Sequence, residues 1–116
     1  MLYYLCMDMY AAIAEPTRRN ILEILAENGQ LSSTDISNRF PISAPAISQH
    51  LKVLKEANLV QMEKRAQQRM YTINPEPMRE MGGWLEKLTK HWEEKYSRLD
   101  ALLEREKNKS KGGGKK

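Results

Sequence analysis

The sequence contains one cysteine, Cys6, among its 116 residues, so an internal disulfide framework is excluded. Its two histidines, His50 and His91, are far apart and match no zinc-site spacing. No apolar run approaches the roughly 20 residues that a membrane-spanning helix needs. We therefore expect a protein without membrane insertion or cofactor, in which Cys6 is a small apolar packing residue.

The amino terminus has no basic leader and meets an acid at Asp8, which favours a cytoplasmic protein over an exported one. The length suits one domain, because a single core is normally built at about 100 to 150 residues. We expect this domain to cover residues 1–106. Residues 107–116 are rich in lysine and glycine and are expected to form a disordered tail.

The net charge of +4 says little about a partner, because five lysines follow Glu106 and residues 1–106 carry a net −1. The distribution of charge is more informative. Residues 43–71 contain five basic and only two acidic residues. A basic excess that is concentrated on one surface is typical of proteins that bind phosphates.

Apolar spacing, capping residues and prolines predict the local structure. Two segments near residues 60–64 and 69–73 alternate apolar and polar side chains, which predicts a β-hairpin. Asn58 is suited to the left-handed position after a helix. The predicted helices cover residues 2–14, 16–28, 33–40, 44–57 and about 78–106.

Only Pro41-Ile42-Ser43 separates the third predicted helix from the fourth, an arrangement typical of a helix-turn-helix. With the hairpin behind it, the fold class is mainly α with a small β-hairpin, a winged helix-turn-helix. Ile47, Leu51 and Leu54 are expected to face the core. The small and polar residues of the opposite face would then be free to enter a major groove of double-stranded DNA.

Each exposed residue of this helix has a plausible role. Gln49 can donate to and accept from a base edge, whereas the serines, His50 and Lys52 suit phosphate oxygens. Ser43 could instead be only a helix cap, and Lys52 and Lys55 only a solvated face. The tip of the hairpin carries further polar and basic residues. They could contact DNA as a wing, or they could form a charged loop that only keeps the protein in solution. The predicted DNA-binding residues are Ser43, Ala44, Pro45, Ala46, Ser48, Gln49, His50, Lys52, Lys64, Arg65, Gln67, Gln68 and Arg69.

Two segments resemble the ArsR/SmtB-type winged-helix repressors. Residues 15–22, EPTRRNIL, are similar to the opening "DPTRxxIL" of that family, and residues 43–60 are similar to its recognition helix. The resemblance covers roughly residues 10–105. It implies a dimer that represses transcription, including that of its own gene, until something releases it. The release could come from a partner protein, from a small molecule, or only from a change in the protein's own concentration.

The chain departs from the family at the metal sites. Residues 31–40 contain no Cys or His, so the cysteine site of the metal-sensing members is absent. His91 and Glu94 are the only fragment of a second site, which favours a surface or interface histidine over a metal ligand. Asn58 stands where glycine is usual, and the wing tip lacks glycine.

The last predicted helix carries an apolar stripe longer than one small core can cover, so part of it should bury against a second copy. The expected interface unites the terminal helices, and a two-fold dimer would read half-sites about 10 base pairs apart, or a multiple of this, in a pseudo-palindrome. The predicted interface residues are Leu2, Leu5, Met9, Ile13, Trp84, Leu88, Trp92, Leu99 and Leu103.

Three other functions are compatible with parts of the sequence. A catalytic pair of Ser48 and His50 is rejected, since residues two apart on a helix point about 200° away from each other. A ligand- or metal-responsive sensor is compatible with DNA binding. A protein-interaction module without specific DNA binding is the third, favoured by the adaptable methionine side chains.

Overall fold

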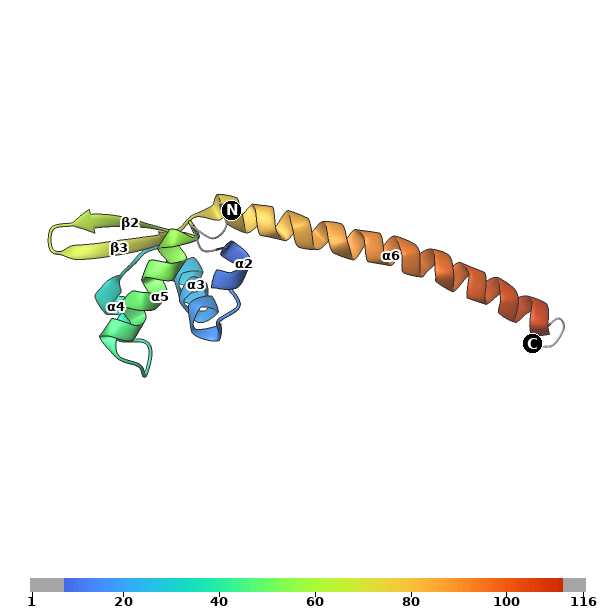
Figure 1. Cartoon of the computed structure of the whole chain (residues 1–116), viewed down its shortest axis with the longest axis horizontal. Helices are drawn as coiled ribbons and strands as arrows, with labels where there is room; N and C mark the ends of the chain where they lie inside the picture. Colours follow the sequence, from blue (N-terminus) through green and yellow to red (C-terminus); the bar gives the residue numbers. More distant parts are fainter. Residues whose placement is uncertain (1–7, 112–116) are drawn as a thin grey trace. The chain divides into compact units, whose positions relative to one another are not determined.

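The computed structural model describes residues 8–111, and their side chains up to residue 106. The chain forms two compact units that divide between Glu80 and Met81, where the sequence predicts one domain. The first unit contains short helices and a small sheet, and the second is most of one long helix (Figure 1). Within the described range, no helix combines the length and apolar character needed to cross a membrane.

The first unit begins with α2 (Met9–Ala12) and α3 (Pro16–Asn28). Proline is tolerated at the start of α3 because its missing N–H would have no partner there. Gly29 ends α3 at a φ of 83°, a backbone region that favours glycine. The predicted second helix is confirmed. The predicted first helix lies mostly outside the described residues, as do Leu2, Leu5 and Cys6.

Two further helices form the helix-turn-helix: α4 (Ser33–Ser37) and α5 (Ala44–Glu56). Helix α4 is shorter than predicted, because the N–H groups of Arg39 and Phe40 bond to carbonyls only three residues back and tighten the chain into turns. The connection therefore covers residues 38–43. Asn58 adopts the predicted left-handed conformation after α5, with a φ of 66°.

The sheet has three antiparallel strands in the order β1-β3-β2. The predicted hairpin is confirmed as β2 (Val60–Arg65) and β3 (Gln68–Ile73). Its turn is shorter than predicted, and Ala66 takes a positive φ of 54° where glycine is usual. Strand β1 (Leu31–Ser32) was not predicted, because two residues are too few to show an alternating pattern.

The core of the first unit lies between α3, α4, α5 and the sheet. The predicted inward residues Ile47, Leu51 and Leu54 are 1% exposed or less, so that prediction is confirmed. The opposite face of α5 is consequently turned toward solvent. The largest fully buried side chains are Ile21, Leu25, Ile36, Ile47, Leu51, Leu54 and Leu59.

Helix α6 (Pro75–Lys111) starts before and ends after its predicted bounds of 78 and 106. It starts earlier because Pro75 and Pro77 lie in its first turn, where no N–H donor is required. It ends later because residues 107–111, which were assigned to a disordered tail, contain no glycine or proline to stop a helix.

Candidate nucleic-acid interface

A groove of about 920 Å³ runs between α5 and the hairpin. Figure 1 shows the hairpin beside α5, and α5 contacts β2 directly. The groove is therefore built within the first unit, from the helix that the sequence predicts to enter DNA and from the predicted wing. Its lining residues are Ser33, Ala44, Pro45, Ser48, Gln49, Leu51, Lys52, Lys55, Met62, Lys64, Arg69 and Tyr71.

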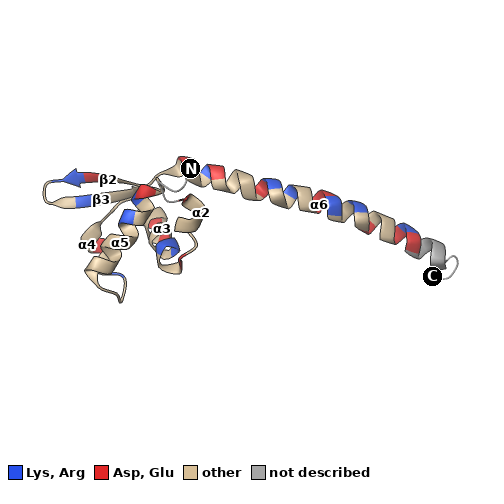
Figure 2. Cartoon of the chain, in the orientation of Figure 1, with Lys and Arg blue, Asp and Glu red and all other residues tan. Residues whose placement is uncertain are grey.

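Helical spacing and strand pairing explain why the basic side chains line the groove. Ser48, Lys52 and Lys55 are four and three residues apart, so they share one face of α5. On the hairpin, Lys64 pairs with Arg69 across the strands, and the two side chains lie on one face of the sheet. Figure 2 shows basic residues on both elements.

The groove lining contains four cationic side chains and no carboxylate. Like charges on two facing walls strengthen the local field, because the low-dielectric walls focus it into the groove. Such a concave cationic surface attracts polyanions and suits phosphate oxygens.

Seven of the predicted DNA-binding residues line this groove, and the structure separates others from it. Gln67 and Gln68 line an adjoining hollow of about 430 Å³ near the turn, together with Thr34 of α4. Ser43 caps α5 by accepting a hydrogen bond from the Ala46 N–H at 3.3 Å. The seven groove residues are Ala44, Pro45, Ser48, Gln49, Lys52, Lys64 and Arg69.

Arg65 is not a groove residue, although it belongs to the predicted wing. Its guanidinium donates to Gln30 Oε1 at 3.3 Å and to Glu63 Oε1 at 3.4 Å. Adjacent strand residues face opposite sides of a sheet, so Arg65 cannot share the face of Lys64. The sequence alone suggests one shared surface, because Arg65 follows the last residue of the alternating pattern and therefore looks like part of the turn.

Sequence reasoning missed Ser33, Lys55, Met62 and Tyr71 as groove residues. Tyr71 could have been found from the alternation of the strand, since it lies two residues after Arg69 and shares its face. Ser33 gave no such signal, because its position depends on how α4 packs against α5.

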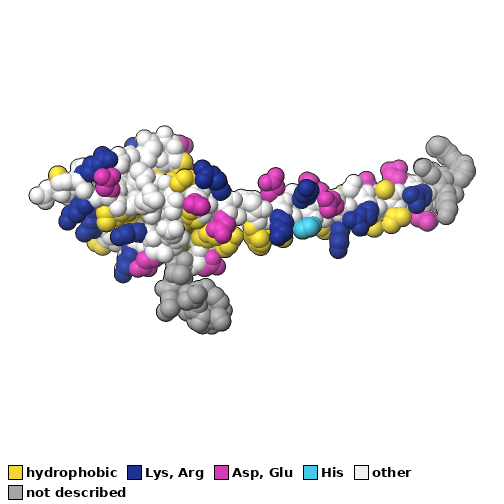
Figure 3. Space-filling model, turned by 90° about the horizontal axis from the view of Figure 1, so that it is seen from above, with side chains coloured by type: hydrophobic (Ala, Val, Ile, Leu, Met, Phe, Trp, Pro, Cys, Tyr) yellow, Lys and Arg dark blue, Asp and Glu magenta, His cyan; other side chains and the backbone are white. Residues whose placement is uncertain are grey.

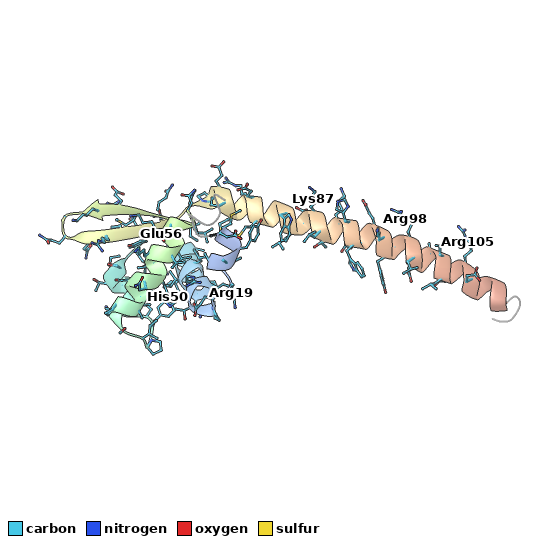
Figure 4. The ribbon with its side chains drawn as sticks, in the orientation of Figure 1. Arg19, His50, Glu56, Lys87, Arg98 and Arg105 are labelled. Atoms are coloured by element: carbon cyan, nitrogen blue, oxygen red, sulfur yellow. The ribbon has the colours of Figure 1, made fainter. Side chains whose placement is uncertain are left out.

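His50 does not line the groove either. Its Nδ1 lies 3.3 Å from Arg18 Nη1 and 4.0 Å from Glu15 Oε1. A guanidinium can only donate hydrogen bonds, so Nδ1 accepts from Arg18 when the imidazole is neutral, whereas a protonated imidazole is attracted to Glu15 instead. Figure 4 labels His50 on α5 and Arg19 on the neighbouring α3. The side chain thus joins α5 to α3, whereas Ser48 lines the groove, and no hydrogen bond links these two among the described residues.

The segment that resembles the family opening connects three helices. Glu15 caps α3 by accepting from the Arg18 N–H at 3.0 Å. Arg18 Nε donates to the Ala12 carbonyl at 2.7 Å, and Arg19 Nη1 donates to the Ile13 carbonyl at 2.9 Å. These bonds satisfy carbonyls at the end of α2 that have no partner within the helix.

The pKa of Glu15 is lowered from 4.5. Desolvation raises it, but the hydrogen bond from the Arg18 N–H and the positive charges of His50 and Arg18 outweigh desolvation. A carboxyl whose pKa is lower in the folded state stabilises the fold above its unfolded pKa. That contribution disappears as the pH falls through the folded-state pKa, below 4.5.

Glu15→Gln should therefore lower the melting temperature by a few degrees at pH 7, because Gln loses the charged acceptor that caps α3. We expect the difference from the wild type to shrink as the pH falls below 4.5, which thermal unfolding followed by circular dichroism would measure. Glu23→Gln, at an exposed position of α3, is the control. A pH-independent difference would contradict the assignment.

Helix α6 exposes an apolar stripe along residues 84–103. Trp92 is 65% exposed and stacks on Tyr96 with ring centroids 5.7 Å apart. Figure 3 shows the hydrophobic side chains following one edge of the helix. Leu85, Leu88, Trp92, Leu99 and Leu102 occupy the two apolar positions of a heptad repeat, the pattern of a helix that pairs with another helix.

The other predicted interface residues differ in how much of each side chain is exposed. Met9 and Ile13, at α2, are half-buried. Trp84, Leu88, Leu99 and Leu103 are 47–57% exposed on α6. His91 and Glu94 also lie on α6, and no group of three or more potential metal ligands occurs in the described part of the chain.

Comparison with known proteins relates this geometry to a family. A family model described as "Bacterial regulatory protein, arsR family" matches residues 15–62. The transcriptional repressor SdpR of Bacillus subtilis is 35% identical over 78 residues, which are 67% of this chain and 86% of that protein.

Two solved structures show the same fold. The crystal structure of a "Possible transcriptional regulator for arsenical resistance" is 34% identical with a TM-score of 0.67, and the match covers 82% of this chain and 95% of that one. The homodimeric winged helix-turn-helix DNA-binding domain Mb0332 of Mycobacterium bovis is 22% identical with a TM-score of 0.58, over 71% of this chain and 75% of that chain. The predicted winged helix-turn-helix fold is thus confirmed.

Proposed function

The chain belongs to the ArsR family of bacterial transcription regulators, and from this premise we propose that it represses transcription as a homodimer bound to a pseudo-palindromic operator. The observation that carries the proposal is the cationic groove beside the exposed face of α5. Four positive charges without a carboxylate attract a phosphate backbone, and the adjoining polar residues of α5 can reach base edges.

Helix α5 is the recognition helix in this proposal. Ala44 and Pro45 are small enough to let its first turn approach the floor of a major groove. Gln49 is exposed, lines the groove and carries both a donor and an acceptor, so it suits the edge of an adenine. Lys52 and Lys55, one turn further on, and Lys64 and Arg69 of the wing contact phosphates and fix the register of the protein on the duplex.

The dimer pairs the stripe of α6 with that of a second copy. Eight large apolar side chains of this helix are 47–65% exposed in the single chain: Trp84, Leu85, Leu88, Trp92, Tyr96, Leu99, Leu102 and Leu103. A helix that exposes so much apolar surface gains free energy by pairing. Two-fold symmetry then presents two recognition helices to one face of the duplex.

The protein acts in the cytoplasm, where its operator lies, and it performs no catalysis in this proposal. Release from the operator follows a signal other than a metal bound by cysteines, since the chain has only Cys6. A small molecule or a protein partner that binds near the dimer seam would shift the spacing of the two recognition helices.

Selection of bound duplexes from a random library, followed by footprinting on the DNA upstream of the chain's own gene, tests the proposal. We expect an enriched inverted repeat whose half-sites are about 10 base pairs apart, or a multiple of this, and a protected region that contains it. Enrichment of no sequence over the input library would reject specific recognition and favour a protein-interaction module.

Gln49→Ala should relax sequence preference more than it reduces affinity. The variant loses a two-point contact to a base, which is worth about 1–3 kcal/mol of discrimination, but it keeps every positive charge. Binding of the selected operator and of a scrambled duplex, compared by fluorescence anisotropy, would show a loss confined to the operator. Equal losses on both duplexes would contradict a role in reading sequence. Gln61→Ala, on the hairpin but outside the groove lining, serves as the control.

A further inference from the structure

Tyr71 lies at the centre of the sheet and on the wall of the groove. It pairs with Leu31 of β1 on one side and with Met62 of β2 on the other. Only 6% of its surface is exposed, and it lines the groove. Its ring is therefore held by packing on both sides, while the part that stays accessible opens into the groove.

The hydroxyl of Tyr71 makes no hydrogen bond to any residue that the structure describes. A buried phenol normally finds a partner, because an unpaired buried polar group costs free energy. Ser32, the buried polar residue of β1, follows this rule, since its Oγ accepts from the Asp35 N–H at 3.0 Å. The hydroxyl of Tyr71, by contrast, keeps an unused hydrogen-bond donor at the wall of the groove.

The charges around Tyr71 indicate what its partner should be. Arg69 lies on the same face of β3 as Tyr71, two residues before it, and Lys64 pairs with Arg69 from β2. Lys52 and Lys55 of α5 line the other wall. Cations offer no lone pair to accept a hydrogen bond, so a donor in this setting is satisfied by an anionic oxygen that the cations also attract.

The hydroxyl retains its proton at neutral pH. Desolvation raises the pKa of Tyr71 above 10, although the charge of Arg69 lowers it in part. Tyr71 therefore enters the groove as a neutral hydrogen-bond donor.

We propose that the Tyr71 hydroxyl donates a hydrogen bond to a phosphate oxygen of a DNA strand whose backbone lies in the groove between α5 and the hairpin. This inference rests on the proposed function and adds a feature to it. The groove holds backbone rather than bases at this depth, so Tyr71 strengthens binding to every sequence and fixes the height at which the wing sits on the duplex.

Tyr71→Phe tests the proposal, because it removes the hydroxyl and keeps the ring. We expect the affinity for operator and scrambled duplexes to fall by the same factor, about tenfold for each bound chain. The salt dependence should stay unchanged, since no charge is removed. Thr72→Val is the control: it removes a hydroxyl from the next residue of β3, which is half-buried and lies on the opposite face.

A second measurement identifies the acceptor and does not depend on how stable the variant is. Single methylphosphonates, which replace one charged phosphate oxygen with a methyl group, are placed in turn along each half-site of the selected operator. Both proteins should lose the attraction between that phosphate and the groove cations, but at one position the loss should be smaller for Tyr71→Phe than for the wild type, so that the two effects are not additive.

The outcomes separate this inference from the proposed function. If Tyr71→Phe binds as tightly as the wild type, or if the two effects add at every position, the inference is overturned while the regulator function stands. If the wild type selects no duplex at all, both the proposed function and this inference are rejected.

Discussion

Trp92→Glu combined with Leu99→Glu is expected to yield a monomer whose affinity for the operator is at least about 100-fold lower than that of the wild type. Trp92 and Leu99 are 65% and 52% exposed on the single chain and occupy equivalent positions of the heptad pattern. Burial of each such side chain contributes about 1.5–3 kcal/mol, and a two-fold interface counts each of them twice. Glutamates at these positions remove that gain and place like charges opposite each other.

The loss of the dimer costs operator affinity because a monomer has one recognition helix for two half-sites. Sedimentation velocity would give the oligomeric state and fluorescence anisotropy the affinity. The control carries two glutamates on the polar side of the same helix, Lys87→Glu with Ser97→Glu, and should remain dimeric; Figure 4 shows Lys87 on α6. A variant with both stripe residues changed that still sediments as a dimer would place the interface elsewhere.

Lys52→Ala combined with Arg69→Ala is expected to weaken binding to all duplexes, on the order of 100-fold at low salt. The two residues lie on opposite walls of the groove, one on α5 and one on β3. Each phosphate contact contributes about 0.9 to the slope of log affinity against log salt concentration. Since a dimer loses two contacts from each chain, the slope should become shallower by roughly 3 to 4.

Anisotropy titrations on operator and scrambled duplexes over a range of salt concentrations would measure this effect. Lys87→Ala with Lys90→Ala removes the same number of charges from α6 and should leave the slope close to that of the wild type. A slope that does not change in the groove variant would mean that neither Lys52 nor Arg69 contacts a phosphate.

The confirmed predictions concern features that depend only on residues close together in the sequence. The inward set Ile47, Leu51 and Leu54 was predictable because helical spacing alone puts three such residues on one side. Asn58 was predictable as the left-handed residue after α5, since few residue types tolerate that conformation. The hairpin followed from its alternation of apolar and polar side chains.

The elements that were missed depend on contacts between distant segments. Strand β1 exists because Leu31 and Ser32 pair with Tyr71 and Met70, some forty residues away along the chain. The position of His50 on α5 favoured a DNA contact, but its Nδ1 contacts Arg18 of α3. Arg65 was read as part of the wing surface, although the true register of β2 turns it toward Gln30 and Glu63.

The sequence by itself determined the helix-turn-helix, the wing and the apolar stripe of α6, because spacing of 3.6 or 2 residues and capping chemistry act within a few residues along the chain. Only the tertiary structure decided which polar side chains share the groove. It brought Lys52 and Lys55 opposite Lys64 and Arg69, placed His50 of α5 beside Arg18 of α3, and placed Tyr71 on the wall of the groove. Strand register and helix packing set these neighbours, and both are fixed only when the whole core closes.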